Sequence, residues 1–152
     1  MPQLSEILSP SRTVCRVDGA SKKRLLETIA QTIADDQPNL DYATVLDQLI
    51  AREKLGSTGL GGGIAIPHCR VEHCPAPLGS LVTLATGIDF DAPDDAPVDL
   101  LFVLIVPAEE HQEHLDILAT IARRFSQADY CASLRAATDA QSLYDAACAP
   151  ID

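Results

Sequence analysis

Residues 99–106 read DLLFVLIV, one aspartate followed by an unbroken apolar run. A strand with one face in water alternates apolar and polar residues, whereas a strand covered on both faces is apolar at every position. The run is also far shorter than the roughly 20 apolar residues that cross a bilayer. We therefore predict a buried β-strand at Asp99–Val106, in a sheet with helices on both faces.

The segments on either side of this strand alternate between strand and helix patterns. Strand patterns are found at residues 13–17, 64–66 and 80–86. Helical spacing of apolar residues is found at residues 21–36, 41–55, 109–125, 128–137 and 139–149. Ser21 and Asp41 are suited to cap the first two of these helices, and Gly56 is placed to end the second.

Strands interleaved with helices, together with one strand covered on both faces, predict an α/β fold. The expected architecture is a three-layer sandwich, with a mixed β-sheet and helices on both faces. The aspartate- and proline-rich segment DFDAPDDAPVD at residues 89–99 is interpreted as a surface connection rather than as a linker between domains. A length of 152 residues therefore predicts a single domain spanning residues 1–152.

The composition restricts the partners and the compartment of this protein. Lys and Arg total 11 against 22 Asp and Glu, which gives a formal net charge of −11 without a basic patch. Nucleic acid and anionic membranes are therefore not expected as partners, because both attract clustered positive charge. Five cysteines, an odd number, with no signal peptide at the start, indicate reduced thiols. We expect a cytoplasmic protein without membrane insertion.

A glycine-rich segment, GSTGLGGGIAIPHCR at residues 56–70, carries the pattern that indicates function. It lacks the Gly-Lys-Ser/Thr ending of a P-loop and the G-x-G-x-x-G spacing of a dinucleotide site, so nucleotide binding is not expected. The hydroxyls of Ser57 and Thr58 and the exposed backbone amides could receive an anion, although a tight turn has the same composition. Pro67 stiffens the backbone before His68, as a positioned nucleophile requires.

The segment REKLGSTGLGGGIAIPHCR, residues 52–70, resembles the active-site signature of the fructose/mannitol-type enzyme IIA domains of the bacterial phosphoenolpyruvate-dependent phosphotransferase system. LSEILSPSRTVCRV, SKKRLLE, PVDLLFVLIVPA and HLDILATIARRF resemble the nitrogen-regulatory branch of that family, in the same order. The resemblance covers nearly the whole chain. It implies that His68 is the phosphorylated histidine, His114 the second active-site histidine, and Arg52 the arginine that holds the phosphoryl group.

Histidine chemistry agrees with these implied roles. A neutral imidazole attacks phosphorus through one nitrogen while an acceptor holds its other N–H, and the phosphoramidate that forms is itself a good donor. Arg52 and His114 would supply charge and a hydrogen bond to the phosphoryl oxygens. Ser57, Thr58 and Gly59 are predicted to bind the phosphoryl group through hydroxyls and backbone amides, although either hydroxyl could instead cap the local backbone.

Two histidines in the segment HQEH, His111 and His114, compete for the second active-site role. The helix predicted at residues 109–125 carries an apolar stripe formed by Leu115, Leu118, Ile121, Ala122 and Phe125. Leu115 directly follows His114, in agreement with the family pattern. We therefore favour His114 and predict that His111 is a solvated surface residue.

A zinc-binding module is the alternative from another class of function. The segment HCRVEHC and the two helix histidines supply plausible zinc donors, namely His68, Cys69, His73, Cys74, His111 and His114. However, adjacent side chains in an extended segment point to opposite sides, and no CxxC pair is present. The same objection applies to a thiol enzyme that would use Cys69 and His68. We therefore expect no metal and no cofactor, and we interpret Cys69 as a small residue that fits the turn.

These observations together predict a transferase component of the phosphotransferase system that forms a phosphohistidine and takes no free small-molecule substrate. The expected donor is an HPr-type histidine phosphocarrier protein, itself supplied by enzyme I from phosphoenolpyruvate. A single IIA-like unit favours a regulatory role, in which phosphorylation state selects partner proteins, with targets expected in nitrogen or potassium control. The alternative is a sugar-specific IIA component that passes its phosphoryl group to a IIB domain.

Overall fold

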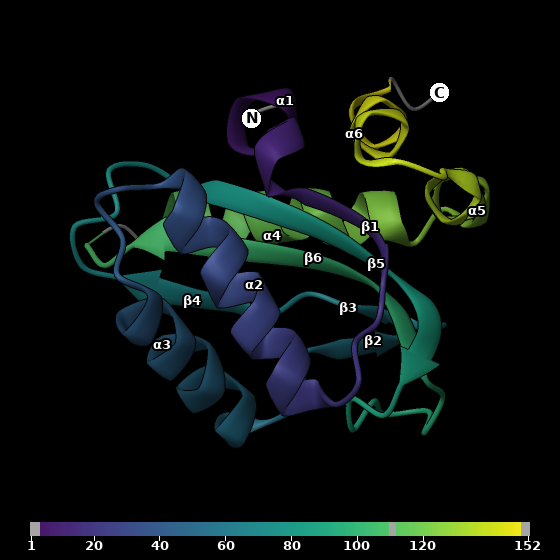
Figure 1. Ribbon diagram of the computed structural model, residues 1–152, viewed down its shortest axis with the longest axis horizontal. Helices are drawn as coiled ribbons and strands as arrows, with labels where there is room; N and C mark the ends of the chain where they lie inside the picture. The colour runs from purple at the N-terminus through teal and green to yellow at the C-terminus, as the bar shows by residue number, and fades with distance from the viewer. Residues whose placement is uncertain (1–3, 110–111, 150–152) are drawn as a thin grey trace.

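The computed structural model describes residues 4–109 and 112–149. Figure 1 shows how its helices and strands are arranged. The helices are α1 (Leu4–Ile7), the 3-10 helix η1 (Pro10–Arg12), α2 (Lys22–Asp36), α3 (Tyr42–Leu55), α4 (Gln112–Phe125), α5 (Ala128–Ala136) and α6 (Ala140–Cys148). The strands are β1 (Thr13–Val17), β2 (Gly59–Gly61), β3 (Ile64–Ala65), β4 (His68–Val71), β5 (Leu78–Ile88) and β6 (Val98–Pro107).

The six strands found within the described residues form one mixed sheet. Its order is β1-β5-β6-β3-β2, and β4 pairs with β6 on the same side as β3. Strands β5 and β6 run antiparallel, whereas β1 lies parallel to β5, and β3 and β4 lie parallel to β6. The mixed β-sheet predicted from the sequence is therefore confirmed.

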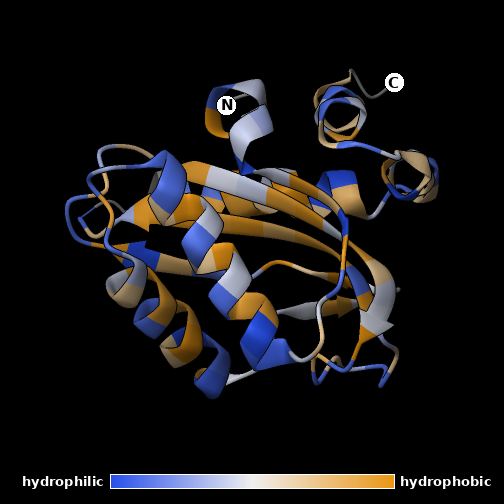
Figure 2. Cartoon of the chain, viewed as in Figure 1, coloured by the Kyte–Doolittle hydropathy of each residue, from blue (hydrophilic) through white to orange (hydrophobic). Residues whose placement is uncertain are grey.

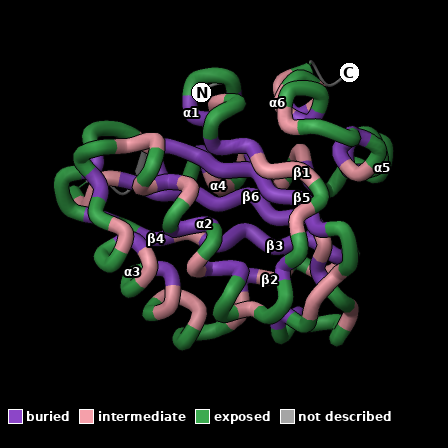
Figure 3. Tube along the Cα trace, in the orientation of Figure 1, coloured by how far each residue is buried: buried purple, intermediate pink, exposed green. Residues whose placement is uncertain are grey.

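Strand β6 is buried on both faces, as its continuous apolar sequence predicts. Alternate residues from Leu101 to Ile105 pack in one core cluster with residues of α2 and α3. The intervening residues from Leu100 to Val106 pack in a second cluster with residues of α4, α5 and α6. Figure 1 shows α2 and α3 on one side of the sheet and α4 on the other, and Figure 3 shows the buried strands between them. The three-layer architecture is confirmed.

The predicted helix boundaries agree closely with the structure because their capping residues behave as expected. The Ser21 side chain accepts a hydrogen bond from the Arg24 amide, and the Asp41 side chain accepts one from the Thr44 amide. Gly56 follows α3 with a φ of 153°, a conformation that L-residues rarely adopt. Short elements without a clear pattern, α1, β2 and β4, were not predicted. Within residues 4–109 and 112–149, no helix has the length and apolar character of a membrane span.

The apolar stripe of α4 differs from the prediction at one position. Ile117, Ile121 and Phe125 are buried, whereas Leu115 is 59% exposed. The buried side of α4 also includes His114, and one residue step on a helix rotates the side chain by about 100°. Leu115 therefore lies at the border of the buried side of α4. Figure 2 shows more generally that apolar residues alternate with polar ones along the helices. The prediction that Leu115 belongs to the buried stripe is wrong.

A buried arginine ties three distant segments of the fold together. Arg12 is only 8% exposed. Its Nε donates to the Gly79 carbonyl of β5 at 2.9 Å, and its Nη2 donates to the Ile7 carbonyl of α1 at 2.8 Å. Its Nη1 binds the Asp36 carboxylate at the end of α2 at 2.5 Å. Hydrogen bonds from Ser11 and Gln37, together with Arg12, lower the pKa of Asp36 to about 2.

Replacing Arg12 with methionine is expected to lower the free energy of unfolding by about 2–4 kcal/mol, because two backbone carbonyls and the Asp36 carboxylate lose a buried donor. Urea denaturation followed by circular dichroism measures this change. The matched control is Arg24→Met on α2, where the side chain is 75% exposed and the expected change is within about 0.5 kcal/mol. Equal losses in the two variants would contradict the prediction.

Candidate functional site

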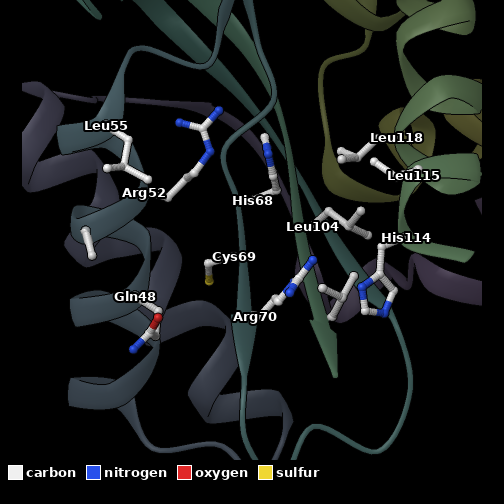
Figure 4. A pocket seen from close by; sticks show the side chains of 12 residues that line it. Gln48, Arg52, Leu55, His68, Cys69, Arg70, Leu104, His114, Leu115 and Leu118 are labelled. Carbon is white, nitrogen blue, oxygen red and sulfur yellow. The ribbon is translucent and has the colours of Figure 1, made fainter. Parts of the chain in front are cut away.

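A cleft of about 520 Å³ opens beside β4, between α3 and α4. We call it the His68 cleft, and its lining includes Arg52 from α3, His68 and Arg70 from β4, Leu104 from β6, and His114, Leu115 and Leu118 from α4. Figure 4 shows these side chains. The structure therefore brings together Arg52, His68 and His114, the three residues to which the sequence resemblance assigned catalytic roles.

Pairing between β4 and β6 decides which side chains enter the cleft from the sheet. His68 lies opposite Leu104 and Cys69 lies opposite Ile105, in parallel register. Leu104 belongs to the core cluster under α4, whereas Cys69 and Ile105 belong to the cluster under α2 and α3. His68 thus points toward the α4 side of the sheet, and Figure 4 shows Cys69 directed toward the α3 side. Arg70, two residues after His68, shares the His68 face.

Arg52 and His114 reach the cleft from the ends of two helices. Arg52 lies in the last turn of α3 and its Nη1 donates to the Gly56 carbonyl at 2.9 Å, which holds the side chain beside the helix end. Figure 4 shows its guanidinium group at about the same height in the view as the His68 ring, on the α3 side of that ring. His114 lies near the start of α4 and is only 4% exposed. The cleft therefore combines two arginine side chains, Arg52 and Arg70, with two imidazoles.

The protonation of the His68 ring follows from its hydrogen bond. Nδ1 lies 2.7 Å from the backbone carbonyl oxygen of Ile66. A carbonyl oxygen can only accept, so Nδ1 must carry the proton. In the neutral ring Nε2 then has the free lone pair. The Pro67 carbonyl accepts from the Leu104 amide at 2.9 Å, which fixes the backbone between Ile66 and His68 to β6.

The environment of His68 favours the neutral ring. Burial lowers the pKa of His68, and the positive charge of Arg52 lowers it further. The hydrogen bond to Ile66 and the charge of Glu53 raise the pKa, but burial is the largest contribution. An imidazole with a pKa below the ordinary value of about 6.5 is neutral at pH 7. The ring is therefore in the form that can act as a nucleophile.

An NMR titration of His68 is expected to give a midpoint below pH 6.5, because the charged ring is disfavoured by burial. Since the folded-state pKa lies below the unfolded value, the neutral form persists as the pH falls past 6.5 and is lost only at lower pH. Arg52→Gln removes a nearby positive charge and is expected to move the midpoint upward. A wild-type midpoint at or above 6.5, or a downward shift in Arg52→Gln, would contradict this account.

The hydroxyls of the glycine-rich segment form hydrogen bonds within the protein. Ser57 Oγ donates to the Phe90 carbonyl at 2.8 Å and accepts from the Gly59 amide at 3.0 Å. Thr58 is 6% exposed, and its hydroxyl donates to the Glu53 carboxylate. Neither residue, nor Gly59, lines the His68 cleft. The phosphoryl-binding role of Ser57, Thr58 and Gly59 stays a prediction.

The three consecutive glycines of this segment form the end of β2 and the turn that leads to β3. Gly61, Gly62 and Gly63 have φ values of 90°, 66° and 82°, in the left-handed region. A Cβ on Gly63 would also approach the Arg135 Nη2 to 2.8 Å, so the Arg135 side chain would have to move. The Gly62 amide donates to the Asp94 carboxylate at 3.0 Å. These glycines are therefore explained by backbone geometry.

The described part of the chain offers little support for the alternative functions based on a metal ion or on a reactive thiol. Within residues 4–109 and 112–149, no three His, Cys, Asp or Glu side chains are grouped so that they could hold a metal ion. Cys69 packs into the core, where burial raises its pKa to about 12, with a smaller contribution from Cys74. Its thiol is therefore protonated and poorly nucleophilic. His111 lies outside the described residues, so its predicted surface position stays a prediction.

Comparison with protein families identifies the fold and the system to which the chain belongs. The profile described as phosphoenolpyruvate-dependent sugar phosphotransferase system, EIIA 2, matches residues 6–147. The chain belongs to this family. The resemblance found in the segment at residues 52–70 is thereby confirmed.

Individual relatives carry a name more specific than that of the family. The chain is 50% identical over 144 residues to the nitrogen regulatory protein of Pseudomonas aeruginosa, covering 95% of this chain and 94% of that relative. It is 45% identical over 143 residues to the nitrogen regulatory protein of Escherichia coli, covering 93% of this chain and 87% of that relative. The crystal structure of nitrogen regulatory protein IIA-Ntr from Neisseria meningitidis has a TM-score of 0.88 at 39% identity, covering 94% and 97% of the two chains. The chain is similar to nitrogen-regulatory IIA proteins over nearly its full length.

Two residues, one in the His68 cleft and one beside it, were not singled out in the sequence. Arg70 lines the cleft because it stands two residues after His68 on an extended strand, and this spacing was a usable signal. Glu53 precedes Thr58 in the sequence and binds it in the structure, but it does not line the cleft. A glutamate on a helix next to an arginine and a lysine reads as an ordinary solvated residue, so no local pattern indicated its burial.

Proposed function

We propose that this IIA protein is a regulatory phosphocarrier, which accepts a phosphoryl group on Nε2 of His68 from an HPr-type histidine phosphocarrier protein. The observation that carries the proposal is the hydrogen bond from Nδ1 to the Ile66 carbonyl. It leaves the Nε2 lone pair available on a half-buried, neutral ring in an open cleft. A reversible phosphoryl carrier needs this combination, because the same nitrogen must attack phosphorus and later leave it.

The proposed transfer needs no reactant other than the phosphorylated donor protein and His68, because one P–N bond forms as another breaks. The Nε2 lone pair of His68 forms a P–N bond while the P–N bond of the phosphorylated donor histidine breaks. The donor imidazole leaves with the bonding electron pair. The Nδ1 proton of His68 stays in its hydrogen bond with Ile66 throughout. Positioning and charge stabilisation therefore account for most of the catalysis in this step.

Arg52 and His114 are proposed to stabilise the phosphoryl group during transfer. A guanidinium group forms strong charge-assisted hydrogen bonds with phosphoryl oxygens, and an imidazole N–H can donate a further one. Both side chains line the His68 cleft. The predicted phosphoryl-binding role of Ser57, Thr58 and Gly59 requires their internal hydrogen bonds to rearrange on phosphorylation.

The rim of the cleft supports a protein partner rather than a free small-molecule substrate. Leu55 is 85% exposed and Leu115 is 59% exposed, and the two residues lie on opposite sides of the cleft, on α3 and α4. Exposed apolar side chains around a site are typical of a surface that another protein covers. The names of the relatives favour protein targets in nitrogen control. We propose that the protein meets these targets in the cytoplasm and that the phosphorylation state of His68 selects among them.

The direct test is reconstitution with labelled phosphoenolpyruvate, enzyme I and the HPr-type carrier, followed by peptide mapping. Acid-labile label is expected on the peptide that contains His68, and only when the carrier is present. Addition of a IIB domain tests the sugar-specific alternative, because rapid transfer to IIB would favour it. Label on another residue, or no label at all, would overturn the proposed function.

A further inference from the structure

A buried carboxylate, Glu53, lies next to Arg52 in the last turn of α3. The Glu53 side chain is only 5% exposed. One oxygen lies 3.0 Å from Lys22 Nζ and accepts from the Thr58 amide at 3.3 Å, while the other accepts from the Thr58 hydroxyl. A carboxylate is costly to bury unless its oxygens are paired. Three donors from two segments meet that requirement, so Glu53 fastens the Thr58 backbone to α3.

Thr58 is connected in turn to the phosphoryl acceptor. The Ile66 amide donates to the Thr58 carbonyl at 3.0 Å. The Ile66 carbonyl then accepts the Nδ1 proton of His68 at 2.7 Å. Strand β3 ends at Ala65, so the Ile66 amide is bonded to Thr58 outside the ladder of β3 with β6. The residue that selects the His68 tautomer is therefore held in place by Thr58.

Each hydrogen bond in this series donates toward the carboxylate. His68 Nδ1 donates to the Ile66 carbonyl, the Ile66 amide donates to the Thr58 carbonyl, and Thr58 donates to Glu53. If the Ile66 carbonyl moves away, the neutral imidazole can place its proton on either nitrogen. A ring protonated on Nε2 has no lone pair there and cannot attack phosphorus.

We propose that Glu53 and Thr58 are positioning residues for phosphoryl transfer, which act through the Ile66 carbonyl to keep the His68 proton on Nδ1. This inference rests on the proposed role of His68 as phosphoryl acceptor. In the unphosphorylated protein it assigns the Thr58 hydroxyl to Glu53. Lys22 completes the arrangement by balancing the buried charge of Glu53.

The test compares three variants of the full chain. Thr58→Val keeps the shape of the side chain and removes the hydroxyl, whereas Thr58→Ser keeps the hydroxyl. Thr13→Val is the matched control, because Thr13 is 4% exposed and its hydroxyl donates to the Ser9 carbonyl at 2.8 Å, on the β1 side of the sheet. The Thr13→Val variant therefore loses a buried threonine hydroxyl without touching the chain to His68.

The first readout is the nitrogen NMR shifts of the His68 ring in the unphosphorylated protein, which report the tautomer directly. Thr58→Val is expected to lose the preference for the Nδ1 proton, and Thr58→Ser and Thr13→Val are expected to keep it. The second readout is phosphoryl transfer from the HPr-type donor. Thr58→Val is expected to lower kcat about tenfold with little change in KM, because the donor still docks on the same surface.

A wild-type tautomer and rate in folded Thr58→Val would overturn the inference. So would a loss that Thr58→Ser fails to restore or that Thr13→Val reproduces, since both would indicate a general loss of stability. If Thr58→Val does not fold, Glu53→Gln tests the inference by the same two measurements, and a wild-type tautomer and rate in that variant would overturn it. The NMR readout does not depend on phosphoryl transfer, so the two failures can be told apart. A wild-type protein that accepts no phosphoryl group would overturn the proposed function, whereas an unchanged His68 tautomer in folded Thr58→Val would overturn the positioning role of Thr58.

Discussion

The His68→Ala variant is expected to accept no phosphoryl group from the HPr-type donor, a loss of at least about 10⁴-fold in transfer rate. Among the described residues of the cleft, no second side chain replaces the Nε2 lone pair. Cys69 points into the core with a pKa raised to about 12, and His114 is almost completely buried. The measurement is transfer of label from the phosphorylated carrier, with thermal unfolding as the check on folding.

The matched control for this variant is His73→Asn. His73 belongs to the same HCRVEHC segment, is exposed, and has a φ of 68°, which asparagine tolerates. It is expected to be labelled like the wild-type protein. Removing the His68 ring leaves the Ile66 carbonyl without its donor, which is expected to cost only about 1 kcal/mol of stability. Substantial labelling of folded His68→Ala would contradict the assignment of the acceptor.

The Arg52→Ala variant is expected to accept the phosphoryl group about 100-fold more slowly than wild type, because the transition state loses its charged donor. The effect should fall mainly on kcat at saturating donor. Arg52→Lys is expected to recover only part of the rate, since an ammonium group keeps the charge but lacks the planar pair of N–H donors. Single-turnover transfer kinetics separate these three proteins.

Arg24→Ala on α2 is the control for loss of an arginine away from the cleft, and it is expected to transfer at the wild-type rate. Arg52 also donates to the Gly56 carbonyl at the end of α3, so its removal could fray that helix end. Circular dichroism and thermal unfolding of Arg52→Ala monitor this effect. A folded Arg52→Ala protein with wild-type transfer kinetics would remove Arg52 from the proposed catalytic set.

The fold was largely predictable because its core strand has an unusual sequence. The continuous apolar run in β6 indicated cover on both faces, and the two core clusters on either side of β6 confirm it. Ser21, Asp41 and Gly56 marked helix ends through local hydrogen bonding and backbone geometry. Leu115 was assigned wrongly to the buried side of α4, because spacing alone does not show where the edge of a helix face meets the sheet.

The candidate site was predictable in part. The order Pro67-His68 and the family resemblance singled out the acceptor, and the structure brings Arg52 and His114 to the same cleft. The hydroxyls of Ser57 and Thr58 could not be assigned from sequence, since a hydroxyl in a glycine-rich segment can bind a ligand or cap the backbone equally well. Their partners, Phe90 and Glu53, come from other segments of the chain.

The sequence by itself determined the order of the longer strands and helices, the layered architecture and the identity of the histidine proposed to carry the phosphoryl group. These follow from short-range patterns, because periodicity, caps and a local motif involve residues close together along the chain. Only the tertiary structure decided that the Ile66 carbonyl holds Nδ1 of His68, that Arg52 and His114 meet beside β4, and that Glu53 binds Thr58. Such contacts join separate elements, and their geometry depends on how the whole core packs.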